Sequence, residues 1–373
     1  MDSIRQVLDG RASEVSLADW RSRAQISGDV VYFQYSTQGV EKNVSEVFVW
    51  DLDKTYLDTT LDSLWAVVRI AIERAFQKKN IPGTQALLTV LAREWSQQNQ
   101  NVFPIFFITA SPPQMEERMT EKFTYDRIKP LGCFYKDNLR NLHPKRLWRL
   151  TKQVGYKVQA LLQLRTRLGK DVQQVLFGDD SESDAVIYSL YSDICARRLG
   201  AAELRELLRS LWVTGEQIDE ILQLQLKVPE NDPVQKVYIN LAEDTDPEYY
   251  LKFGRRTLPT ANSFQVAVDL YQDCRLSREG VLAVAQDLVY NFGFTPDELL
   301  VSFEDLIRRK ILGTRAVSDL LVFFAEKGLF PVSYKPSFHV PSETRVENGR
   351  VFQLEGHFEP WVPERVDYFH DDR

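Results

Sequence analysis

Short apolar runs alternate with longer amphipathic stretches through residues 44–200, and this alternation predicts the secondary structure. The runs at 47–50, 103–108 and 175–177 have the length and composition of strands that are covered by helices on both faces. Strands that alternate with helices in this way form a parallel sheet with right-handed crossovers. The pattern therefore predicts an α/β fold, with a Rossmann-like, doubly wound parallel sheet over this part of the chain.

The predicted helices carry an apolar residue at every third or fourth position, so each has one face to bury. They span residues 61–76, 84–95 and 157–168, and Thr84 suits the N-cap of the second. A short additional strand is expected at 30–33, ahead of the main sheet.

After about residue 200 the pattern changes to helices, beginning with 201–212 and 215–226. A polar break at 229–233 contains two prolines and favours a boundary in this region. We expect four segments: an N-terminal appendage (1–43), an α/β core (44–200), a mostly helical C-terminal domain (201–330) and an extended tail (331–373).

Composition narrows the classes of function. A chain of 373 residues is longer than one hydrophobic core usually grows, which favours two domains. The net charge of −7 disfavours a nucleic-acid-binding protein, because such proteins neutralise phosphates with Lys and Arg. Three widely separated cysteines predict neither a disulfide framework nor a zinc site. With no apolar stretch long enough for a membrane helix and no signal-peptide pattern, we expect a soluble, cytoplasmic protein.

Polar residues suited to phosphate chemistry follow the predicted strands. Asp51 and Asp53 come directly after the first strand, and Thr109 closes the second. Because parallel strands present their carboxyl ends at one edge of the sheet, these side chains are expected to converge. One carboxylate could attack phosphorus while the other moves a proton. The alternative is a solvated turn after the strand, and Ser111 is better explained as a helix cap.

A lysine and an acidic loop complete the pattern. Lys157 opens the helix that leads to the third strand, and its spacing to that strand favours it over Lys145 and Lys152. The loop after this strand carries Asp179, Asp180, Glu182 and Asp184. Such crowded carboxylates repel one another unless a cation lies between them, and oxygen ligands suit Mg²⁺. The spacing lacks the glycine and terminal Glu of a helix-loop-helix calcium site, while a solvated acidic turn stays open.

These motifs, in this order, resemble those of the haloacid dehalogenase superfamily of phosphohydrolases. The resemblance covers residues 44–200. It implies that Asp51 forms an aspartyl-phosphate and that Asp53 is the general acid and base. It also implies that Thr109 and Lys157 hold the phosphoryl oxygens.

The same resemblance implies a magnesium site. Its ligands are Asp51, the backbone carbonyl of Asp53, and Asp179, with Asp184 either orienting the lysine or contacting the metal. Within the superfamily, the runs 108–112 and 178–188 look like those of the actin-patch-type phosphatidate phosphatases. That family usually has Gly-Asp-Ser-Gly where this chain has Gly-Asp-Asp-Ser, and Asn where it has Ala110.

The resemblance makes a magnesium-dependent phosphatase the leading function and a lipid phosphate the leading substrate class. Short predicted inserts leave little chain for a lid, and an open site favours a bulky substrate. A basic cluster at 140–152, with Arg146, Trp148 and Arg149, could bind an anionic head group or membrane surface, although the exposed face of a helix is the favoured explanation because basic residues on helices are mostly solvated. Phosphoproteins, sugar phosphates and nucleotides stay open as substrates. The rival function is a catalytically quiet scaffold whose helical domain binds a protein partner.

Overall fold

The structure is a computed structural model of the chain. The residues that it describes are 20–36, 44–56, 80–99, 101–137, 153–181, 183–337, 344–347, 350–353, 362–364 and 366–368. The helix predicted over 61–76 and the basic cluster at 140–152 lie outside these residues, as does Glu182 of the acidic loop.

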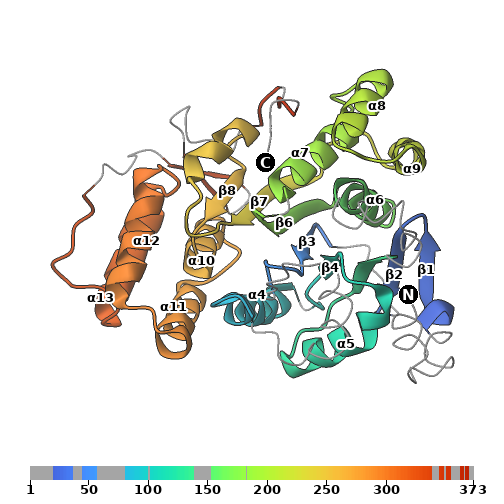
Figure 1. Cartoon of the computed structure of the whole chain (residues 1–373). Helices are drawn as coiled ribbons and strands as arrows, with labels where there is room; N and C mark the ends of the chain where they lie inside the picture. Colours follow the sequence, from blue (N-terminus) through green and yellow to red (C-terminus); the bar gives the residue numbers. More distant parts are fainter. Residues whose placement is uncertain are drawn as a thin grey trace.

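Within the described part of the chain, eight strands form one sheet at the centre of the protein (Figure 1). The strands are β1 (Ala24–Ser27), β2 (Val30–Gln34), β3 (Glu46–Asp51), β4 (Ile105–Thr109), β5 (Gly132–Lys136), β6 (Gln173–Asp179), β7 (Val234–Asn240) and β8 (Thr257–Thr260). Their order is β1-β2-β5-β4-β3-β6-β7-β8. The six strands from β5 to β8 are parallel, while β1 and β2 pair antiparallel at the β5 edge. The prediction of a mostly parallel α/β sheet is therefore confirmed.

Helices cover both faces of this sheet (Figure 1). On one face lie α4 (Thr84–Asn99), α5 (Glu116–Tyr125), α10 (Ser263–Gln272), α11 (Arg278–Phe292), α12 (Pro296–Arg308) and α13 (Thr314–Glu326). On the other face lie α6 (Val154–Arg165), α7 (Asp184–Cys195), α8 (Ala201–Ser210), α9 (Gly215–Lys227) and the 3-10 helix η5 (Pro247–Phe253). A second 3-10 helix, η2 (Pro113–Met115), precedes α5, and β9 (Thr344–Glu347) pairs with β10 (Arg350–Gln353) as a separate hairpin.

Alternation along the strands divides the apolar residues between the two cores. Val47 and Val49 of β3 face the core under α6 and α7, whereas Phe48 and Trp50 face the core under α4. The Trp50 ring stacks on Phe177 of β6 with centroids 3.9 Å apart, and Phe177 in turn stacks on a tyrosine of β7 at 5.0 Å. The stacking of these rings packs the central strands β3 and β6 against each other and against β7.

The sheet continues past the boundary expected near residue 200. The helices predicted at 201–212 and 215–226 are present as α8 and α9, and α12 begins with a capping box formed by Thr295 and Glu298. The hydrophobic pattern did not predict β7 and β8, which extend the same sheet from within the region 201–330. The polar residues Gln235 and Lys236 interrupt the apolar run of β7, and Lys236 is buried because it pairs with Asp269 of α10 at 2.7 Å. Both hydrophobic cores also extend across residue 200.

Among the described residues, no helix combines the length and the apolar character that a transmembrane span requires.

Candidate functional site

The strand order places β3 where the direction of winding reverses. The chain passes from β3 to β4 and β5 on one side, and then returns to β6 on the other side of β3. Ligands of open α/β sheets bind at the carboxyl ends of the strands beside such a reversal. Asp51, Thr109 and Asp179 are the last residues of β3, β4 and β6, so the structure brings these three predicted residues to that edge.

Lys157 lies between two of the predicted carboxylates. Its Nζ atom is 2.8 Å from Oδ1 of Asp51 and 2.6 Å from Oδ1 of Asp184. All three side chains are buried. Helix α6 begins at Val154, earlier than predicted, which puts Lys157 in its first turn. An ammonium group in this position neutralises part of the negative charge and fixes both carboxylates at the strand ends.

Asp53 is held from the neighbouring strand. The hydroxyl of Thr109 donates a hydrogen bond to Oδ2 of Asp53 at 2.6 Å, and the backbone N–H of Ser111 donates to the same hydroxyl at 3.0 Å. The single hydroxyl proton of Thr109 is therefore directed at Asp53 in this structure. Ser111 does not cap the following helix as expected, because the N-cap residue of η2 is Pro112.

Three carboxylates form a compact acidic group. Oxygen atoms of Asp51, Asp179 and Asp184 all lie within 4.8 Å of one another, and all three residues are buried. Asp184 also accepts a hydrogen bond from the backbone N–H of Asp179 at 3.1 Å. Gly178 leaves room for this arrangement, since a Cβ atom there would lie 2.4 Å from Oδ2 of Asp184.

Left-handed backbone occurs on both loops of the site. Lys54, next to Asp53, has a φ of 55°, and Ser183, next to Asp184, has a φ of 62°. Non-glycine residues adopt this conformation at an energetic cost, so the surrounding contacts must hold it. The turn at Ser183 lies between Asp179 and Asp184, whose carboxylates both belong to the acidic group, and the turn at Lys54 directly follows Asp53.

Two buried tyrosines that were not among the predicted site residues, Tyr156 and Tyr188, hold the strand ends. The hydroxyl of Tyr156 donates to the carbonyl of Thr109 at 2.7 Å, and that of Tyr188 donates to the carbonyl of Phe177 at 2.9 Å. Burial raises the pKa of both phenols well above the ordinary value, so both stay protonated donors. The position of Tyr156 directly before Lys157 is the only sequence signal that could have indicated it.

Asp180 turns away from the acidic group toward the chain that follows β7. Its Oδ2 atom accepts hydrogen bonds from the backbone N–H of Ala242, at 2.8 Å, and from the hydroxyl of Thr245. Of the acidic residues described in this loop, Asp179 and Asp184 therefore belong to the compact group and Asp180 does not.

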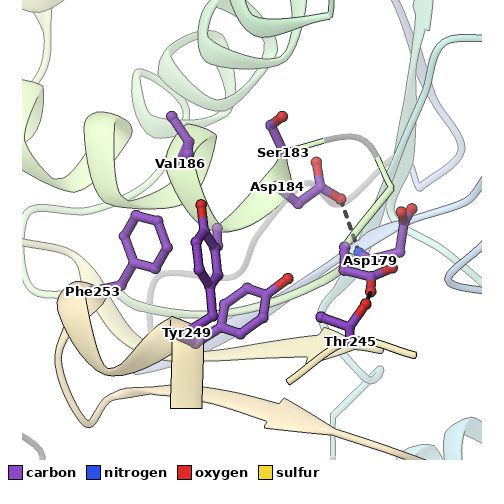
Figure 2. Close-up of a pocket in the computed structure, with 10 residues that line it drawn as sticks. Asp179, Ser183, Asp184, Val186, Thr245, Tyr249 and Phe253 are labelled. Carbon is purple, nitrogen blue, oxygen red and sulfur yellow. Dashed lines mark hydrogen bonds between the residues drawn. The ribbon is translucent and has the colours of Figure 1, made fainter. Parts of the chain in front are cut away.

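A pocket opens beside the acidic loop. One wall consists of Asp179, Asp180, Ser183 and Asp184, and the other contains Val186, Tyr249 and Phe253 (Figure 2). The aromatic residues come from η5, which packs against α7. The predicted site residues did not include this wall, because nothing in the sequence of η5 indicates its nearness to the 179–184 loop.

Among known protein families, a catalytic-domain family matches part of the chain. Residues 47–205 match the family described as "Phosphatidate phosphatase APP1, catalytic domain". No curated protein and no solved structure matches the chain. The matched range supports a phosphatase of the phosphatidate phosphatase type. It contains all the predicted site residues and ends before β7 and η5.

Proposed function

We propose that the chain is a magnesium-dependent phosphatase that hydrolyses a lipid phosphomonoester through an aspartyl-phosphate on Asp51. The observation that carries this proposal is the buried contact of Lys157 with both Asp51 and Asp184 at the strand ends. These residues lie within the range that matches the phosphatidate phosphatase family. The lipid substrate is inferred from the activity for which that family is named.

In the first step a carboxylate oxygen of Asp51 attacks phosphorus, and the bond between phosphorus and the ester oxygen breaks. Protonated Asp53 gives its proton to the leaving alcohol. In the second step Asp53 takes a proton from water, whose oxygen attacks phosphorus and breaks the bond to Asp51. Inorganic phosphate leaves, and both aspartates return to their starting states.

Thr109 and Lys157 have distinct roles in this scheme. The hydroxyl of Thr109 keeps Asp53 in place through its 2.6 Å hydrogen bond, and it can donate to a phosphoryl oxygen only after rotating away from Asp53. The ammonium of Lys157 lies 2.8 Å from the proposed nucleophile and offsets negative charge as phosphorus is approached.

The donor set fits a magnesium ion. Three buried carboxylates and one ammonium leave a net formal charge of −2 in this group, which a divalent cation would balance. Asp51, Asp179 and Asp184 would hold the ion through oxygen atoms, the ligands that Mg²⁺ prefers. The ion, when bound, offsets the negative charge of the phosphoryl oxygens. The carbonyl of Asp53 stays an expected additional ligand.

The proposal is tested with the full chain and a panel of phosphomonoesters that includes dihexanoyl phosphatidate, glycerol 3-phosphate and p-nitrophenyl phosphate, with and without magnesium. Asp51→Asn keeps the side-chain shape but removes the attacking charge, so turnover should fall by at least about a thousandfold. Asp269→Asn is the matched control, since Asp269 is equally buried but pairs with Lys236 away from the site.

Beryllium fluoride should form a stable adduct with Asp51 in the parent protein and none in Asp51→Asn. Near-normal turnover in the variant, or a parent that hydrolyses no member of the panel, would overturn the proposed function.

A further inference from the structure

The segment after β7 lies outside the family match but is attached to the acidic loop. β6 and β7 pair up to Asp179 and Asn240, and the N–H of Asp180 donates to the carbonyl of Asn240 at 3.1 Å. The carboxylate of Asp180 then accepts from Ala242 and Thr245. These contacts fix the start of the 241–253 segment against the acidic loop.

The same segment supplies the aromatic wall of the pocket. Tyr249 is half-buried, whereas Tyr250 and Phe253 are buried against the core under α7. The Tyr249 and Tyr250 rings meet edge to face with centroids 5.3 Å apart, and Nζ of Lys252 lies 3.6 Å from the Tyr249 ring centroid. Figure 2 shows Tyr249 and Phe253 below Val186, with Tyr249 nearer than Phe253 to Asp179. This wall presents carbon surface within the pocket.

The two walls together restrict what can bind there. Asp180, whose carboxylate lies outside the group that would hold the metal, lines one wall and disfavours a second anionic group on the substrate. The rings and Val186 on the other wall favour an apolar group. A molecule that places one phosphate at Asp51 and an uncharged, apolar portion in this pocket satisfies both walls. Nucleotides and sugar bisphosphates, which carry further charge or many hydroxyls, do not.

We propose that this pocket binds the apolar part of the substrate, the ester-proximal carbons of acyl chains, with Tyr249 as a specificity-determining contact. Asp180 acts through Ala242 and Thr245 as a positioning residue for the aromatic wall. This inference rests on the proposed function, because it assigns the same site a substrate class. It makes 241–253 part of the active site, although that segment lies beyond the matched residues.

The test compares three substrates of increasing chain length: glycerol 3-phosphate, dibutanoyl phosphatidate and dihexanoyl phosphatidate. In the parent protein kcat/KM should rise with chain length. In Tyr249→Ala the ratio of kcat/KM for the dihexanoyl ester to that for glycerol 3-phosphate should fall about tenfold, the scale of a lost apolar contact in a pocket. Tyr249→Phe keeps the ring and should restore the ratio. Tyr290→Ala removes a tyrosine that is 80% exposed on α11 and is the matched control.

The positioning role of Asp180 is tested separately, by comparing changes in KM and kcat. Asp180→Ala removes the acceptor of both hydrogen bonds to 242 and 245, so it should raise KM for dihexanoyl phosphatidate more than it lowers kcat. Thr245→Val removes one of these bonds and should produce a smaller change in the same direction. A loss confined to kcat in Asp180→Ala would overturn the positioning role.

A binding measurement tests the pocket independently of the proposed reaction. Dihexanoylglycerol has no phosphate, and it should raise the Tm of the parent protein but not that of Tyr249→Ala. This shift without hydrolysis of any phosphomonoester would support the pocket and overturn the proposed function. Hydrolysis with the same chain-length ratio in the parent protein and Tyr249→Ala, and no Tm shift, would overturn the pocket and leave the phosphatase standing.

Discussion

Replacing Gly178 with Ala tests whether the close packing of Asp184 sets the geometry of the site. A Cβ atom at residue 178 would lie 2.4 Å from Oδ2 and 2.6 Å from Cβ of Asp184. Carbon atoms in contact normally stay at least about 3.5 Å apart, so Asp184 has to move by roughly 1 Å. Gly178 has no positive φ, and the requirement for glycine here is therefore one of space.

Asp184 cannot move without losing its contacts. It is fully buried at the start of α7, where Lys157 lies 2.6 Å from one carboxylate oxygen and the N–H of Asp179 donates to the other at 3.1 Å. Overpacking of this kind typically costs about 1–3 kcal/mol, partly offset by about 0.4–1 kcal/mol from the stiffer unfolded chain. A displacement of about 1 Å at a catalytic group can lower turnover about a hundredfold.

We expect Gly178→Ala to lower the free energy of unfolding by about 1–2 kcal/mol and turnover of dihexanoyl phosphatidate by about a hundredfold. Thermal melts and steady-state kinetics measure the two effects. Gly200→Ala is the matched control, because a Cβ atom there meets no atom within 4 Å. Turnover within about twofold of the parent would refute the idea that the Gly178 contact places Asp184 for the reaction.

Three further outcomes follow from the charges and burial of named groups. Magnesium at about ten times its Kd should stabilise the parent protein by about 1.4 kcal/mol in a thermal melt and leave the stability of Asp179→Ala unchanged. An equal stabilisation of both proteins would show that Asp179 is not a metal ligand. Burial raises the pKa of Cys195 to about 12, so iodoacetamide at pH 8 should label exposed Cys274 and reach Cys195 only after denaturation, as mass spectrometry would show. Burial acts to raise the pKa of Asp232, but the positive charges of Arg256 and a second arginine outweigh it, so the pKa is lowered overall. A carboxylate with a lowered pKa stabilises the fold above about pH 4, and this stabilisation is lost as the pH falls below that value. Asp232→Asn should therefore flatten the decline of Tm with acid, and an unchanged decline would contradict this origin.

The strand-end residues could be predicted because two simple rules agree there. Asp51, Thr109 and Asp179 each end an apolar run, and parallel strands bring such ends to one edge. Lys157 was predicted from its spacing to the third strand, and the structure places it between Asp51 and Asp184. Neither rule required knowledge of contacts between distant parts of the chain.

Strand β7 could not be predicted because its buried polar residue is compensated from far away. Lys236 looks like a surface residue in sequence, yet Asp269 pairs with it inside the protein. Arg275 likewise forms a buried ion pair with Glu46 at the start of β3, at 2.9 Å. Such pairs depend on the tertiary fold, so hydrophobic periodicity alone underestimates how far the sheet extends.

The different orientations of the adjacent residues Asp179 and Asp180 could have been predicted from the sequence. Consecutive residues on an extended strand point to opposite sides, and β6 ends at Asp179. Asp179 and Asp180 therefore cannot both face the same ion while the strand geometry persists, and the left-handed turn at Ser183 is what returns Asp184 to the Asp179 side. This geometry leaves the carboxylate of Asp180 available for Ala242 and Thr245. The family that the chain resembles usually has Ser where this chain has Asp180. The contacts of Asp180 with the segment after β7 explain the aspartate at this position.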